Sequence, residues 1–187
     1  MLKKILVAVD ESASSDWAFA TALEVASSLK AELLMVHALD IFAPASPQHP
    51  SVPASGSMIE VDETAYENYQ QKWTKHVERY NTLLRQKQSE ADVSGISCEY
   101  IQPYGHPGPV ICQAATENDA DLIVVGNRDQ TTLIELVLGS VSNYVLHHAP
   151  CSVTVVHSAN RREATAKNDA KEESTSEHAT FTSIGIT

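Results

Sequence analysis

Five short apolar runs, rich in branched aliphatic residues, constrain the fold of this 187-residue chain more than any other feature. They are Leu2–Val9, Glu32–Ala38, Ile96–Ile101, Asp121–Gly126 and Ser152–His157. Most of them lack the strict alternation of apolar and polar residues that marks a strand with one face in water. We therefore expect strands that are buried on both faces, as in parallel sheets. Because stretches with helical periodicity separate the runs, the pattern predicts an α/β fold: a doubly wound, open, parallel five-stranded sheet with helices on both faces.

The helical stretches are expected at residues 13–29, 62–87 and 106–118, and from Gly139 to just before Pro150. The second stretch carries an aromatic stripe at helical spacing, which we expect to pack against the sheet rather than to line a ligand site. The stripe includes Tyr66, Tyr69, Trp73 and Tyr80.

Residues 1–157 are expected to form one domain, with a long proline-rich loop at residues 42–57. Residues 158–187 are polar and carry mixed charges, so we expect a disordered tail. The roles of the loop and the tail stay open.

The formal net charge of −11 argues against binding to nucleic acid or to an anionic membrane surface. No stretch approaches the ~20 apolar residues of a membrane span, and the first apolar run is shorter than the core of a signal peptide. Three widely spaced cysteines indicate reduced thiols rather than a disulfide framework, and hence a cytoplasmic location.

The strongest functional signal lies between the fourth run and the last helical stretch. Gly126 ends an apolar run, and Gly139–Ser140 opens a helical pattern, so free backbone N–H groups of Ser140 and Val141 could face an anion. The hydroxyl groups of Ser140 and Ser142 add donors. The alternative is that both glycines merely end secondary-structure elements.

Two acidic residues bear on this anion site. Asp129 places a carboxylate where a phosphate is expected, which argues against it. Asp10 follows the first run and would share a crevice with Gly126 if the first and fourth strands are neighbours. It could accept hydrogen bonds from a base or a ribose, or it could simply order the turn before the first helix.

The sequence contains no legible catalytic constellation. We find no Ser–His–Asp set, no CxxC and no P-loop lysine, and we expect no metal site from His147, His148 and Cys151. His37 is expected to be packed and hydrogen-bonded. Binding is therefore favoured over turnover, with weak ATP hydrolysis as the most that we expect.

Four segments resemble the universal stress protein family, and together they span Lys3 to His157. They are KKILVAVDES, AELLMVHALD, DADLIVVGNRD and LGSVSNYVLHHAPCSVTVV. The resemblance implies a strand order of 3-2-1-4-5, a cytoplasmic role in stress adaptation, and a homodimer formed partly by the last strand, Ser152–His157. Such pairing would also cover an exposed sheet edge.

Some members of that family hold ATP through a Gly-x-x-Gly-x9-Gly-[Ser/Thr] motif, whereas others lack the motif and do not bind ATP. Carried onto this chain, the resemblance implies a site for ATP or another adenine nucleotide. Its residues are Ala8, Val9, Asp10, Ala38, Val125, Gly126, Arg128, Asp129, Gly139, Ser140, Val141 and Ser142.

The chain departs from the motif at Asp129, which replaces the second glycine. Its carboxylate would repel a phosphate by about 4 kcal/mol at ~4 Å and an effective dielectric near 20. Arg128 would offset part of this repulsion, and a bridging Mg²⁺ ion would reverse its sign. The alternative function is a nucleotide-free interaction module whose unidentified protein partners read the proline-rich loop or the tail.

Overall fold

The strands and helices alternate along the whole described part of the chain. The structure, a computed structural model, describes residues 2–50, 63–127 and 139–157. The elements in chain order are β1 (Lys4–Ala8), α1 (Ala13–Leu29), β2 (Glu32–Val36), α2 (Glu63–Val93), β3 (Cys98–Ile101), α3 (Pro107–Glu117), β4 (Leu122–Gly126), α4 (Ser140–His148) and β5 (Ser152–Val156). All five predicted strands and all four predicted helices are therefore present.

The strands form one parallel sheet in the order β3-β2-β1-β4-β5. This order confirms the predicted fold class. It places β1 in the centre, with β2 on one side and β4 on the other, so that the carboxyl ends of these three strands lie side by side. From β1 the chain first adds strands on one side of the sheet, β2 and β3, and then on the other side, β4 and β5. In such folds, ligands bind at the point where the strand order switches sides.

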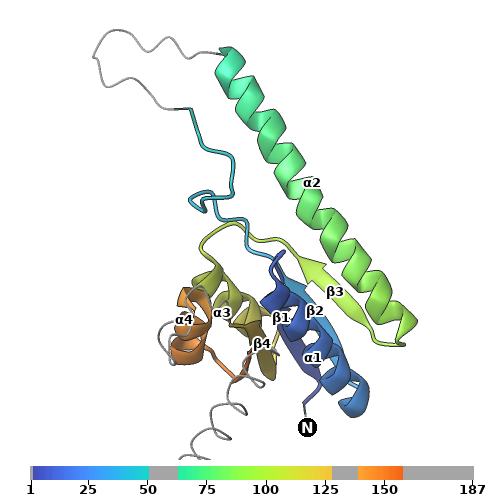
Figure 1. Cartoon of the computed structure of the whole chain (residues 1–187). Helices are drawn as coiled ribbons and strands as arrows, with labels where there is room; N and C mark the ends of the chain where they lie inside the picture. The colour runs from blue at the N-terminus through green and yellow to red at the C-terminus, as the bar shows by residue number, and fades with distance from the viewer. Residues whose placement is uncertain (1, 51–62, 128–138, 158–187) are drawn as a thin grey trace, which may run out of the picture.

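Each face of the sheet is covered by two helices (Figure 1). Ile5, Val7 and Met35 pack against α1 and the end of α2, whereas Leu6 and Ile123 pack against α3 and α4. Successive side chains of a strand point to opposite faces, so a strand between two helical layers must be apolar throughout. This is the physical origin of the runs that predict the sheet.

Helix α2 corrects two predictions. It continues to Val93 rather than ending at Lys87, because Ala91 is fully buried and the helix stops only near Gly95, whose φ of +72° is left-handed. The aromatic stripe also packs against the sheet only in part. Tyr80 is buried, but Tyr66 is 43% exposed because this end of the helix projects beyond the sheet (Figure 1).

Several predictions fall on residues outside the described ranges. These include Arg128 and Asp129 of the expected site, residues 51–57 of the proline-rich loop, and the tail from residue 158 onward. Within the described ranges, no helix combines the length and the apolar character that crossing a membrane requires.

Candidate functional site

A cavity of about 630 Å³ opens at the carboxyl ends of β1, β2 and β4. Every predicted site residue that the structure describes lies along its wall. These residues are Ala8, Val9, Asp10, Ala38, Val125, Gly126, Gly139, Ser140, Val141 and Ser142. They come from three strand ends, which the sheet topology brings together, and from the start of α4. Their convergence defines a site, and its ligand stays a prediction.

The turn after β1 forms one side of the cavity. The carboxylate of Asp10 accepts a hydrogen bond from the backbone N–H of Ser12 (2.8 Å) and another from the Ser12 hydroxyl. The Asp10 N–H donates to the hydroxyl of Ser15 (2.9 Å), and Ser12 caps the start of α1. Of the two roles open to Asp10, the structure therefore provides the turn-ordering one, with the side chain still at the cavity wall.

Gly126 has a packing role that the sequence does not reveal. A Cβ built on it would lie 2.4 Å from the carbonyl oxygen of Ser14, in the first turn of α1. Glycine is therefore needed here so that the end of β4 and the start of α1 can approach one another. The residue identity is explained without any ligand, and Gly126 by itself no longer argues for a phosphate.

Asn127 positions the start of α4, and sequence reasoning missed it. Its side chain is 1% exposed, and its Oδ1 accepts a hydrogen bond of 2.8 Å from the backbone N–H of Gly139. Its own N–H donates to the carbonyl of Val156 in β5. The sequence does contain a signal for this role, because Asn127 is a polar residue directly after a fully apolar strand. If such an amide is buried, it needs hydrogen-bond partners within the protein.

Two polar groups at the predicted anion site already have partners within the protein. Asn127 already uses the N–H of Gly139, and the hydroxyl of Ser142 donates to the Gly139 carbonyl (2.9 Å). No side-chain cap hydrogen bond is made at the start of α4. The N–H groups of Ser140 and Val141 and the exposed hydroxyl of Ser140 are the remaining donors on which the predicted site rests.

Helix α2 supplies a ring-bearing wall opposite the strand ends. The imidazole of His37 stacks on Tyr80 with ring centroids 3.7 Å apart, and His76 meets Tyr80 edge-on at 5.1 Å. All three residues line the cavity. His76 and Tyr80 were not among the predicted site residues, although their four-residue spacing on a helix would have placed them on one face.

His37 is packed and hydrogen-bonded, as predicted. Its side chain is buried, and its Nδ1 lies 2.8 Å from the carbonyl oxygen of Val9, which requires that Nδ1 carry the proton and donate. Burial lowers the pKa of His37, while the Val9 hydrogen bond and the charge of Asp10 oppose the shift. The ring is therefore neutral at pH 7, with Nε2 as an acceptor.

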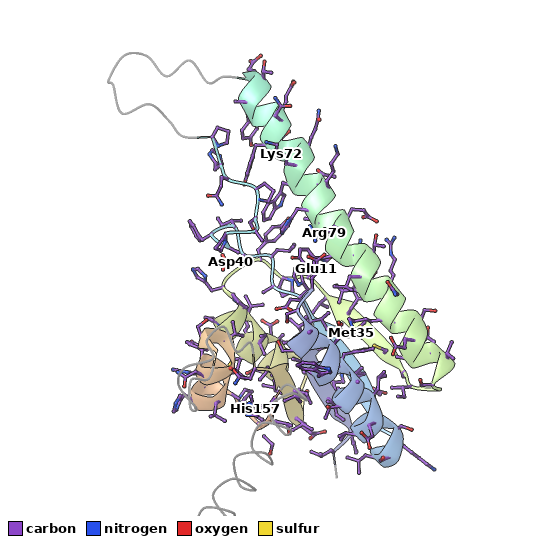
Figure 2. The ribbon with its side chains drawn as sticks, viewed as in Figure 1. Glu11, Met35, Asp40, Lys72, Arg79 and His157 are labelled. Atoms are coloured by element: carbon purple, nitrogen blue, oxygen red, sulfur yellow. The ribbon has the colours of Figure 1, made fainter. Side chains whose placement is uncertain are left out.

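The first part of the proline-rich loop forms the rim of the cavity. Ala43, Pro44, Ala45 and Ser46 all line it. The hydroxyl of Ser46 donates to the carbonyl of Asp40 (2.6 Å), which closes the loop on itself. Asp40 lies near the foot of this loop (Figure 2), and its Oδ2 is 2.9 Å from Nδ1 of His106 at the start of α3.

The cavity is lined by several kinds of group. Serines, the acidic residues Asp10 and Asp40, aliphatic side chains and the rings of His37, His76 and Tyr80 all contribute to it. Across residues 2–50, 63–127 and 139–157, no group of three or more His, Cys, Asp or Glu residues is placed to hold a metal ion.

The comparisons with known proteins agree with one another. The model of the universal stress protein family matches residues 1–157. Universal stress protein Sll1388 of Synechocystis is 31% identical over 153 residues, which are 82% of this chain and 96% of that protein. The solved UspA of Lactobacillus plantarum is 27% identical with a TM-score of 0.63, covering 83% of this chain and 97% of its own. A universal stress protein crystallised in complex with cAMP is 25% identical with a TM-score of 0.57, covering 84% and 99%.

Proposed function

The chain belongs to the universal stress protein family, and from this premise we propose that it is a cytoplasmic regulatory protein that binds an adenine nucleotide with little or no turnover. The observation that carries the proposal is the start of α4. Its first residues, Ser140 and Val141, line the cavity, and its N-cap residue, Gly139, has no side chain. A helix start favours a phosphate through its N–H groups and its dipole.

The cavity fits an adenine nucleotide in size and in chemistry. Its volume of about 630 Å³ lies within the ~300–1,000 Å³ typical of ligand pockets. Ala8, Val9, Ala38 and Val125 would contact the adenosine, and the N–H groups of Ser140 and Val141 would hold a phosphate. The cAMP of the solved relative supports this ligand class.

The charge of the chain favours nucleotides with few phosphates. The net charge is −11, and Asp129 stands in sequence where the family motif has its second glycine. Each phosphate near that carboxylate would lose up to about 4 kcal/mol unless a Mg²⁺ ion bridges the two. We therefore expect AMP or ADP to bind more tightly than ATP, and ATP to depend on Mg²⁺.

Titration calorimetry of the full chain with AMP, and with ATP in the presence and absence of Mg²⁺, tests the proposal. Asp129→Asn removes only the charge, whereas Asp129→Gly also frees the backbone, so the pair separates the two costs. Tighter ATP binding by both variants supports electrostatic repulsion. If neither the native chain nor either variant binds any adenine nucleotide, the proposed ligand is wrong.

The engaged N–H of Gly139 and the packing role of Gly126 favour one second candidate, a nucleotide-free interaction module. Freshly purified protein should release nucleotide on denaturation if the first proposal is right, and none if the second is right. Mass spectrometry of the released small molecules distinguishes them.

We also propose a homodimer that pairs through β5, at the edge of the sheet. Among the described residues β5 pairs only with β4, and two of its five residues are exposed and three half-buried, which supports pairing with a second copy. Light scattering should then give twice the chain mass of 20.3 kDa, and a monomer mass would contradict the proposal.

A further inference from the structure

The projecting half of α2 carries a continuous row of rings. Tyr66, Tyr69, Trp73 and His76, here called the aromatic row, recur three or four residues apart and so share one face of the helix. Neighbouring ring centroids are 6.4, 6.4 and 5.3 Å apart along the row. This half of the helix lies beyond the sheet (Figure 1), and Trp73 stacks on Tyr104, which follows β3, with 6.1 Å between the ring centroids.

A short proline-rich stretch, Pro47–Pro50, lies against the aromatic row. The ring of His49 is 4.9 Å from that of Tyr69 and 6.2 Å from that of Tyr66. Figure 2 shows this part of the chain rising from Asp40 alongside the upper turns of α2. Pro47 and Pro50 are half-buried, whereas Gln48 and His49 are exposed. The two prolines are therefore partly covered by protein, and His49, although exposed, meets the row through its ring.

The sequence of this stretch favours a polyproline II conformation. Proline fixes its own φ near −65° and biases the preceding residue toward extended backbone, and residues 47–50 lie in neither a helix nor a strand. A polyproline II helix has three residues per turn, so Pro47 and Pro50 fall along one edge, whereas Pro44 is exposed and lies in a turn. Such an edge, already stiff before binding, is what aromatic surfaces recognise in proline-rich ligands.

We propose that the aromatic row of α2 is a polyproline-binding surface and that the chain's own Pro47–Pro50 stretch is its ligand. The ligand belongs to the same chain as the row, so it is bound in cis. It directly follows Ser46, the last residue of the cavity rim. Docking on the row therefore fixes where the rim lies. The row also continues from His76 to Tyr80, and both of these residues line the cavity.

Trp73 offers a direct probe of this docking. The chain has two tryptophans, so Trp17→Phe leaves Trp73 as the sole tryptophan. In that background, Pro47→Ala/Pro50→Ala removes the proposed contacts. Gln48→Ala changes the exposed side of the same stretch and gives up the hydrogen bond from Gln48 to the Ser46 carbonyl (3.1 Å), so it is the control for a change that leaves the prolines in place. We expect acrylamide quenching of Trp73 to rise about twofold in the proline variant, as local opening exposes the ring, and to stay unchanged in the control.

Hydrogen exchange follows the rim in the same proteins. The N–H of Phe42 donates to the Asp40 side chain and the N–H of Ser46 donates to the Ala43 carbonyl. Both should exchange roughly tenfold faster in the proline variant if docking holds the rim. The N–H of Val9, which donates to Val36 within the sheet, should keep its protection and so report that the domain remains folded.

A peptide with the sequence of residues 43–50 completes the test. Added to the proline variant, it should restore protection of Trp73, whereas the same peptide with alanine in place of its prolines should not. Equal quenching in the proline variant and the Gln48→Ala control, or equal action of the two peptides, would overturn the proposal. A dependence of Trp73 quenching on protein concentration in the native sequence would assign the ligand to a second copy and overturn binding in cis.

Discussion

Gly126→Ala should lower the free energy of unfolding even when no ligand is present. The added Cβ would lie 2.4 Å from the carbonyl oxygen of Ser14 and 2.6 Å from its carbonyl carbon. Both are backbone atoms in the first turn of α1. A side chain could rotate away from such a clash. Because these are backbone atoms, the clash can be relieved only if the start of α1 moves away from the end of β4.

The size of the effect follows from how firmly that helix start is held. Ser14 and Ser15 are buried, and the Ser12 cap and the Asp10 turn hold them in place. Inserting a methyl group into a well-packed site costs about 1–3 kcal/mol, and we expect about 3 kcal/mol because the obstruction is backbone. For a chain of this length that corresponds to a fall in Tm of roughly 10 °C.

Urea unfolding followed by far-UV circular dichroism measures the change, with a lower midpoint at an unchanged m-value as the expected result. Gly95→Ala is the control, because Gly95 has a φ of +72° but nothing within 4 Å of the added Cβ. Its cost of about 1–2 kcal/mol comes from backbone conformation alone. Gly95→Asn should be more stable than Gly95→Ala, because asparagine tolerates left-handed backbone. Gly126→Asn should be no more stable than Gly126→Ala, because the clash there is steric.

A ligand-only role for Gly126 makes the opposite prediction. The variant would then unfold like the native chain and lose only nucleotide binding. A free energy of unfolding within about 0.5 kcal/mol of the native value would refute the packing argument. Because the measurement is made without nucleotide, its outcome does not depend on the proposed function.

Three further predictions concern buried titratable groups. Burial lowers the pKa of His37 below its unfolded value of 6.5, so the unfolded chain binds more protons and stability falls as the pH drops through 6.5 toward the folded pKa. The urea midpoint of the native chain should therefore fall between about pH 7.5 and pH 5.5, and that of His37→Gln should fall less. An equal fall in the two proteins would contradict this prediction. Burial raises the pKa of the Cys98 thiol to about 12, so a disulfide reagent at about pH 8 should label it only after unfolding; equally fast labelling of the folded chain would count against this burial. Lys87 is buried over the Phe19 ring, and its Nζ lies 2.7 Å from Asp16. Lys87→Ala should lower the free energy of unfolding in urea by about 2 kcal/mol, whereas Lys87→Met, which keeps the aliphatic stem, should lower it by less than about 1 kcal/mol. Equal losses would show that the ion pair, and not the packing of the stem, dominates.

Much of the fold could be predicted from local sequence because burial on both faces leaves a compositional signature. β4 is apolar along its length and β1 is apolar after Lys4, and their predicted strands are confirmed. The end of α2 could not be predicted in the same way. Its last turns are polar in sequence, and the burial of Ala91 depends on the sheet beneath it.

The candidate site divides in a similar manner. Residues at the ends of β1, β2 and β4 could be chosen in advance because the family resemblance implies which strands are neighbours, and the carboxyl ends of neighbouring parallel strands meet at one edge. Tyr80 and His76 could not, since their place at the cavity depends on where a distant helix crosses that edge. The link from Asn127 to Gly139 likewise joins two chain segments that sequence alone cannot bring together.

The sequence by itself determined the alternation of strands and helices, because each element's periodicity reports which of its faces meet apolar neighbours. Tertiary structure alone decided what the motif residues do. Gly126 accommodates the backbone of Ser14, Asp10 orders a turn, and the N–H of Gly139 is already bonded. The reason is physical: periodicity is a property of neighbours along the chain, whereas a contact or a hydrogen bond depends on atoms that only folding brings within reach.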